Sequence, residues 1–221
     1  MTPLKLIEAD VVGCEQCPRL VEWREQVARE KRASFVNQQY WGRAVPGFGD
    51  PGARLMVVGL APAAHGANRT GRMFTGDRSG DWLYAALYRA GFGNQPESVS
   101  VDDGLEMTDA WVTSPVKCAP PLNKPTTVEI ATCRPYFVRE LEALAPRVLI
   151  ALGGIGFTAV IRHFDIRPRP TFGHGVEVAI DDQTTLIASY HVSQQNTFTG
   201  KLTEPMLDSV FNRAREIISN E

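Results

Sequence analysis

The sequence lacks long apolar runs: no stretch of about 18 hydrophobic residues occurs, so we expect no transmembrane helix and no membrane partner. The first ten residues also lack the basic-then-apolar order of a secretory signal, which predicts a cytoplasmic protein. The sequence also lacks a large excess of charge of either sign, because 23 basic and 25 acidic residues give a formal net charge of only -2. Bulk charge therefore argues against non-specific nucleic-acid binding, although it leaves a local basic face open.

Cysteine is equally scarce, at four residues in 221. In a reducing cytoplasm, four thiols more often form a metal site, or are unrelated core residues, than disulfides. A Cys-x2-Cys pair can grip one metal ion or one edge of a cluster. The candidate ligands are Cys14, Cys17, Cys118 and Cys133. Residue types alone leave zinc and iron–sulfur open, with buried structural thiols as the plain alternative.

Four short apolar runs bounded by turn residues predict buried parallel strands, because such strands form continuous hydrophobic segments. They are Leu55–Leu60, Trp111–Val116, Arg147–Leu152 and Thr185–Tyr190. Helical patterns lie between and after them, at Asp81–Ala90, Thr126–Leu144, Ile155–Phe164 and Glu204–Ser219. This alternation predicts an α/β fold with a parallel sheet covered by helices on both faces. Residues 172–182 predict a small hairpin.

In such sheets a ligand lies beyond the carboxyl ends of the strands, so the loops there are the candidate site. The first of these loops runs from Ala61 to Asp77 and is rich in glycine, which lets backbone approach a ligand. It lacks the ending of a phosphate-binding P-loop, and Asp77 could simply cap the next helix. His191 starts the loop after the fourth strand, where it can donate a hydrogen bond into a cleft or be a satisfied, partly buried histidine.

Two weaker patterns occur at other loops. Gly153–Gly156 open a helix and suit a phosphate, but they lack the full dinucleotide fingerprint. Basic residues in loop-like segments are candidates for a local basic face: Arg69, Arg72, Arg78, Lys117, Lys124 and Lys201.

The motifs taken together resemble the uracil-DNA glycosylase superfamily, and within it family 5 (type b). The resemblance is carried by Gly59–Gly66 (GLAPAAHG), Thr70–Arg72 with Phe74–Asp77, Val116–Pro125 and the His191–Asn196 segment (HVSQQN). It implies a three-layer α/β/α sandwich around a four-stranded parallel sheet. It also implies one domain over residues 1–221, with an N-terminal arm tied down by a [4Fe–4S] cluster on the four cysteines.

The implied activity is excision of uracil flipped out of double- or single-stranded DNA, by a protein that we expect to be a monomer. Two departures bear on specificity. Leu60 stands where family 4 has Glu, and Ser114 stands where many relatives carry an Asn that reads the uracil edge. A hydroxyl recognises a base less specifically than an amide, which offers both donors and an acceptor. We therefore expect a broader range of bases, including hypoxanthine, xanthine or damaged pyrimidines.

The resemblance also implies roles for site residues. Gly59, Ala61, Ala63, Ser114 and Asn196 are candidate substrate-binding residues, with backbone amides near Ala61–Ala63 holding the base and Asn196 orienting its loop or touching DNA. Phe74 is expected to stack on the flipped base, and His191 to donate a hydrogen bond to the base O2. Ala63 takes the place of a water-activating side chain, so Asp77 is the first candidate to position water or offset sugar charge, and His65 the second. The Asn196–Lys201 stretch is expected to enter the minor groove.

Other classes of protein fit parts of the pattern. A non-catalytic iron–sulfur or zinc DNA-binding module would keep the cysteines and basic loops but leave no abasic product. An electron-transfer protein is disfavoured because its ligands would be spread along the chain, and a nucleotide-binding oxidoreductase would depend on Gly153–Gly156 alone.

Overall fold

The computed structural model describes residues 2–220. The helices are α1 (Pro3–Val12), α2 (Pro18–Glu30), α3 (Ala67–Thr70), α4 (Arg78–Arg89), α5 (Thr127–Leu144), α6 (Gly154–His163), α7 (Gln194–Phe198) and α8 (Glu204–Ser219), with short turns η1 (Ala33–Phe35) and η2 (Pro121–Asn123). The strands are β1 (Phe48–Gly49), β2 (Leu55–Val58), β3 (Ala110–Thr113), β4 (Val148–Leu152), β5 (Glu177–Ala179) and β6 (Thr185–Ser189). Within residues 2–220, no helix is both long and apolar enough to cross a membrane.

The strands form one mixed sheet of six, in the order β1-β3-β2-β4-β6-β5. Its four central strands run parallel, with Met56 of β2 opposite both Trp111 and Leu149, which confirms the predicted parallel sheet. The edges are antiparallel: β1 pairs with β3, and β5 pairs with β6. The predicted hairpin at residues 172–182 is therefore wrong in its pairing, since β5 hydrogen-bonds to the last central strand.

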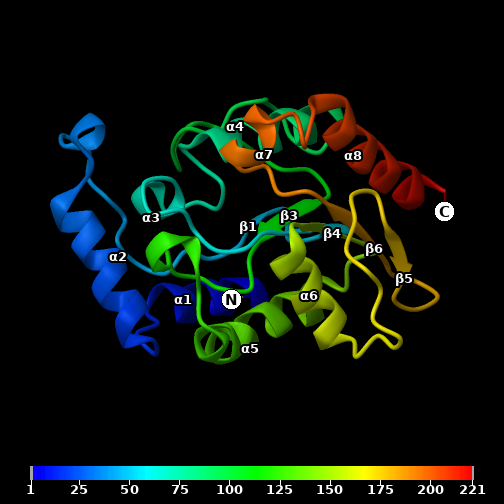
Figure 1. The fold of residues 1–221 in the computed structure, drawn as a ribbon, viewed down its shortest axis with the longest axis horizontal. Coiled ribbons are helices and arrows are strands. Elements are labelled where there is room, and N and C mark those ends of the chain that lie inside the picture. The colour runs from blue at the N-terminus through cyan, green and yellow to red at the C-terminus, as the bar shows by residue number, and fades with distance from the viewer. Residues whose placement is uncertain (1, 221) are drawn as a thin grey trace.

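Helices cover both faces of the sheet, as predicted (Figure 1). Neighbouring strand residues point to opposite faces. Leu55 and Val57 join the core under α4 and α8, whereas Met56 and Val58 join the core shared with α1, α5 and α6. The continuous apolar run of β2 is thus explained by burial on both sides, and the fold is the expected three-layer arrangement with two added edge strands.

The main helices begin and end close to the predicted positions. Thr126 and Glu129 form the predicted capping box at the start of α5. Helix α4 starts three residues earlier than predicted, because Asp77 caps it and extends its first turn.

Two N-terminal helices were not predicted. Both α1 and α2 begin with a proline, Pro3 and Pro18, where the missing N–H is not needed for helix hydrogen bonds. Helix α1 packs on α5, and α2 runs along one flank of the molecule (Figure 1). The N-terminal segment is therefore an integral part of one layer.

Candidate active site

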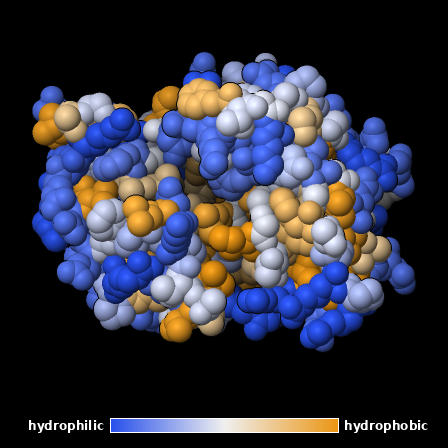
Figure 2. Space-filling view, viewed as in Figure 1, coloured by the Kyte–Doolittle hydropathy of each residue, from blue (hydrophilic) through white to orange (hydrophobic). Residues whose placement is uncertain are grey.

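A cavity of about 850 Å³ opens beyond the carboxyl ends of the central strands. Figure 2 shows it as a hollow near the middle of the face, with apolar residues in its wall. Its lining comes from the loops after β2, β3 and β6, and it includes Ala61, Ala63, His65, Phe74, Asp77, Asn123 and His191. The fold therefore brings together most of the predicted site residues, from segments more than 100 positions apart in the chain.

Phe74 and His191 both line the cavity and lie beside each other, with their ring centroids 6.1 Å apart. Phe74 has a left-handed backbone, at φ 53°, and its ring lies against Gly59. A Cβ at Gly59 would lie 2.7 Å from that ring, so only glycine leaves room for it. Gly59 does not line the cavity, and its lack of a side chain leaves the space that the Phe74 ring occupies.

Burial lowers the pKa of His191 to about 4, so its imidazole is neutral near pH 7. A neutral imidazole keeps one N–H donor and adds no charge to the pocket. Its backbone carbonyl accepts a 2.8 Å hydrogen bond from Nδ2 of Asn196. Asn196 does not line the cavity and instead holds the turn that presents His191.

Asp77 both caps α4 and lines the cavity. Its Oδ1 accepts hydrogen bonds from the backbone N–H groups of Ser79 and Gly80, at 2.9 and 3.2 Å. Its Oδ2 is pressed against Gly66, where an added Cβ would lie only 2.0 Å away. Burial raises the pKa of Asp77, while the two backbone hydrogen bonds act in the opposite direction. The carboxyl group is thus fixed in place by two neighbouring segments.

His65 also lines the cavity, from the loop after β2. Its Nδ1 is 3.1 Å from the hydroxyl of Tyr40, and its carbonyl accepts a 2.8 Å hydrogen bond from Nε of Arg69. Burial, with the nearby Arg32 and Arg69, lowers its pKa. Nδ1 of the ring is therefore engaged by Tyr40.

Ser114 does not line the cavity. Its hydroxyl is buried, donates a 2.8 Å hydrogen bond to the carbonyl of Val116, and lies 3.5 Å from Sδ of Met73. Its predicted base-reading role stays a prediction without support from this geometry. Asn123, nine residues further on, lines the cavity and was missed. The available signal was an amide in the proline-rich loop after the second predicted strand.

Three of the six residues predicted for a local basic face are buried, so for them the prediction is wrong. Arg69, Arg72 and Lys117 are buried: Arg72 pairs with Asp103 at 2.5 Å, and Lys117 pairs with Glu140 at 2.7 Å. Buried charges need partners, and these cations bind groups inside the protein, where DNA cannot reach them. The exposed members of the set are Arg78, Lys124 and Lys201, and exposed Arg32 joins Arg78 at the cavity wall.

The four cysteines line one small hollow between α2, the loop after β3 and α5. Two donors already point at sulfur: Nη1 of Arg24 lies 3.1 Å from Sγ of Cys118, and the backbone N–H of Lys117 lies 3.2 Å from Sγ of Cys133. Burial raises the pKa of Cys133 to about 12. Across residues 2–220, no three Cys, His, Asp or Glu side chains are grouped tightly enough to hold a single metal ion.

Comparison with known proteins identifies the family. The model of the uracil DNA glycosylase superfamily matches residues 46–215. The type-5 uracil-DNA glycosylase of Mycobacterium tuberculosis is 51% identical over 219 residues, which cover 97% of this chain and 82% of that protein. The type-5 enzyme of Thermus thermophilus is 48% identical over 209 residues, or 94% of each chain. A type-4 enzyme of Pyrobaculum aerophilum is 36% identical over 124 residues, or 56% of each chain. The chain belongs to the uracil DNA glycosylase superfamily, in its type-5 group.

Proposed function

We propose that this chain is a uracil-DNA glycosylase of DNA repair, which hydrolyses the N-glycosidic bond of a base flipped out of DNA and leaves an abasic site. The observation that carries the proposal is one cavity, at the carboxyl edge of the sheet, lined by Phe74, Asp77, Asn123 and His191. Extrusion of the nucleotide costs a few kcal/mol, a magnitude general to base-flipping enzymes, glycosylases among them. A uracil mispaired with guanine is easier to extrude than a paired one.

Bond cleavage leaves negative charge on the base and positive charge on the sugar. His191 donates a hydrogen bond to the base O2, where the negative charge develops. Its low pKa keeps the imidazole neutral, so it donates without transferring a proton. Removal of one such preorganised donor typically costs about 2.7–4 kcal/mol of barrier.

Asp77 handles the water. With Oδ1 engaged by the two N–H groups that start α4, Oδ2 is the oxygen that accepts the proton of an attacking water or faces the cationic sugar. The water oxygen bonds to the anomeric carbon as the base departs with the bond electrons. Asp77 is preferred to His65, because the latter is held by Tyr40 and its neighbours carry positive charge.

The base is held by stacking and by a polar edge. Phe74 stacks on its face, backbone amides near Ala61 and Ala63 contact it, and the amide of Asn123 offers both donors and an acceptor to its edge. This donor and acceptor pair matches the edge of uracil, which is proposed as the first substrate, and hypoxanthine, xanthine or damaged pyrimidines are proposed as further ones. The substrates are double- and single-stranded DNA, with Asn196–Lys201 entering the minor groove.

The residues also fit a [4Fe–4S] cluster on Cys14, Cys17, Cys118 and Cys133. The four thiols share one hollow, and four cysteine thiolates are the usual ligand set of such a cluster. The buried Arg24 guanidinium and an N–H donor at the sulfurs suit the negative charge of a thiolate-bound cluster. When bound, the cluster serves as a structural crosslink. It ties the α1–α2 arm to the loop after β3 and to α5, within one domain over residues 1–221.

A direct test uses a duplex oligonucleotide with one U:G pair, treated with hot alkali after incubation. Strand scission at the uracil is expected with the wild type, and more than tenfold slower in single turnover with His191→Ala and with Asp77→Asn. A binding module without catalysis would retain the oligonucleotide but give no scission, which would end the proposal.

A further inference from the structure

Leu122 stands out in the turn that carries the cavity-lining Asn123. Its side chain is 83% exposed, which is unusual for a leucine in a protein with two well-filled cores. Its backbone has φ 55° and ψ 22°, and the next residue, Asn123, also has φ 55°. Two successive non-glycine residues in the left-handed region are unfavourable, so the surrounding structure must hold them there. The turn is held in a conformation that presents an apolar side chain to solvent.

The surrounding structure braces this turn. Asn123 and Lys124 donate backbone hydrogen bonds to the carbonyls of Pro120 and Pro121, at 3.1 and 3.0 Å. The carbonyl of Lys124 accepts a 3.2 Å hydrogen bond from Arg19, the second residue of α2. Arg19 in turn makes two 2.7 Å hydrogen bonds to the carboxylate of Glu129. The exposed leucine therefore sits on a rigid support that begins beside Cys17.

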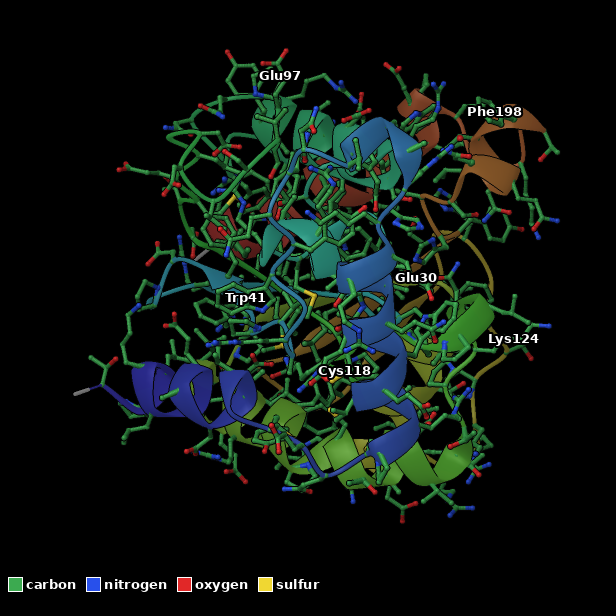
Figure 3. All side chains as sticks on the ribbon, turned by 90° about the vertical axis from the view of Figure 1, so that its left-hand side faces the viewer. Glu30, Trp41, Glu97, Cys118, Lys124 and Phe198 are labelled. Carbon is green, nitrogen blue, oxygen red and sulfur yellow. The ribbon has the colours of Figure 1, made fainter. Side chains whose placement is uncertain are left out.

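The position of the turn relates it to the site. Asn123 lines the cavity, and Leu122 is its immediate neighbour in the chain. The turn follows β3, whereas α7 with its 66% exposed Phe198 follows β6, and β2 and β4 lie between those strands. Three strand spacings of about 4.8 Å place the ends of β3 and β6, from which the two loops start, roughly 14 Å apart. Figure 3 shows Phe198 and Lys124 projecting from the same side of the molecule.

We propose that Leu122 is a DNA-probing wedge, which contacts the duplex on the opposite flank of the extruded nucleotide from α7. Apolar side chains inserted at base steps unstack them, and this offsets part of the cost of base flipping. Lys124 beside it contributes a cation for a phosphate. This inference rests on the proposed glycosylase function. It adds a residue that determines how strongly the protein prefers duplex over single-stranded DNA.

The test compares Leu122→Ala with Val128→Ala, a change at another exposed apolar residue, 72% accessible, in the first turn of α5. Single-turnover excision is measured on a U:A duplex and on the same strand alone. Leu122→Ala is expected to slow duplex excision at least tenfold and single-strand excision less than twofold. Leu122→Met should restore most of the duplex rate, and Val128→Ala should match the wild type on both substrates.

Fluorescence of 2-aminopurine placed next to the uracil gives a second readout. It should rise on binding of wild-type protein to the duplex and rise less with Leu122→Ala. Equal slowing on both substrates would indicate a structural defect, and an unchanged duplex rate would indicate no contact; either result overturns the wedge. If the wild type excises uracil from neither substrate, the proposed function has failed instead.

Discussion

The side-chain amide of Asn68 donates a 3.1 Å hydrogen bond to the backbone carbonyl of Arg24. The same amide lies 3.4 Å from the carbonyl of Ala64, in the wall of the cavity. Because the Arg24 guanidinium reaches Cys118 and the carbonyl of Cys14, one helix residue connects the thiol hollow to the loop after β2. A structural change at the cysteines should therefore alter the loop that lines the active site.

Arg24→Met tests this connection. Arg24 is only 2% exposed, and the substitution keeps its length while removing the donors to Cys118 and Cys14. We expect a loss of about 2–3 kcal/mol of stability, because hydrogen bonds to charged groups contribute about that much. Thermal unfolding and iron content measure the effect. Arg29→Met, at an exposed position of the same helix, is the control, and equal behaviour of the two variants would contradict the connection.

His191→Ala should slow single-turnover excision about 10²- to 10³-fold, because the developing charge on the base loses its donor. His191→Gln keeps an N–H donor and should recover part of the rate. Thermal unfolding of both variants should stay close to that of the wild type. A rate for His191→Ala within threefold of the wild type would remove His191 from the reaction.

The low pKa of His191 makes a pH prediction with a definite sign. The folded value of about 4 lies below the ordinary value of 6.5, so the neutral form is favoured by folding. This contribution to stability is fully present above pH 6.5 and is lost as the pH falls towards 4. Imidazole signals followed by NMR should show His191 titrating below pH 5. Titration of His191 near 6.5 would mean that the ring is not buried as described.

Asp77 has two functions that substitution can separate. Asp77→Asn keeps an oxygen that can cap α4, whereas Asp77→Ala removes the cap and should cost about 1 kcal/mol of stability. Both should slow excision strongly, since both lose the carboxylate. If only Asp77→Ala slows the reaction, in parallel with its stability loss, the residue is a helix cap alone.

Gly66→Ala provides an independent check on the same carboxylate. The added methyl would collide with Oδ2 of Asp77, so the carboxylate must shift. We expect slower excision with Asp77 itself unchanged. Gly52→Ala, at an exposed turn where an added Cβ meets only a side-chain oxygen at 3.5 Å, is the matched control.

Lys117 and Glu140 form a buried ion pair, with each side chain 1% exposed. Thr113 and the backbone N–H of Gly47 also donate to this carboxylate. Lys117→Met leaves a buried charge without its partner and should cost about 3–5 kcal/mol. Adding Glu140→Gln should recover part of that loss, as urea unfolding would show. If the double variant has a lower free energy of unfolding than either single variant, the carboxylate is stabilised mainly by Thr113 and Gly47.

Local sequence signals were sufficient for the central elements of the fold. Helix α8 has the predicted bounds, and the capping box at Thr126 marks the start of α5, because both depend on contacts within one or two turns. The edge strand β1 was not predictable in this way. It has two residues, and only its pairing with Trp111 and Val112 makes it a strand.

The site was predicted less completely, for a physical reason. Position after a strand placed Phe74, Asp77 and His191 at the cavity edge, since parallel strands bring their carboxyl ends together. Position alone could not show that the hydroxyl of Ser114 donates its hydrogen bond to the carbonyl of Val116. It also could not show that a left-handed turn carries Asn123 to the cavity. Likewise, the charge of Lys117 gave no sign of its distant partner Glu140. Such outcomes depend on tertiary neighbours.

The short edge strands have a consequence for how copies of the protein behave at high concentration. An exposed sheet edge offers unpaired N–H and C=O groups that can recruit another chain into a growing aggregate. Here β1 contributes two residues and β5 three, so each border of the sheet offers too short a template for a stable intermolecular ladder. Crowding of many copies on one stretch of DNA should therefore not seed sheet-to-sheet aggregation.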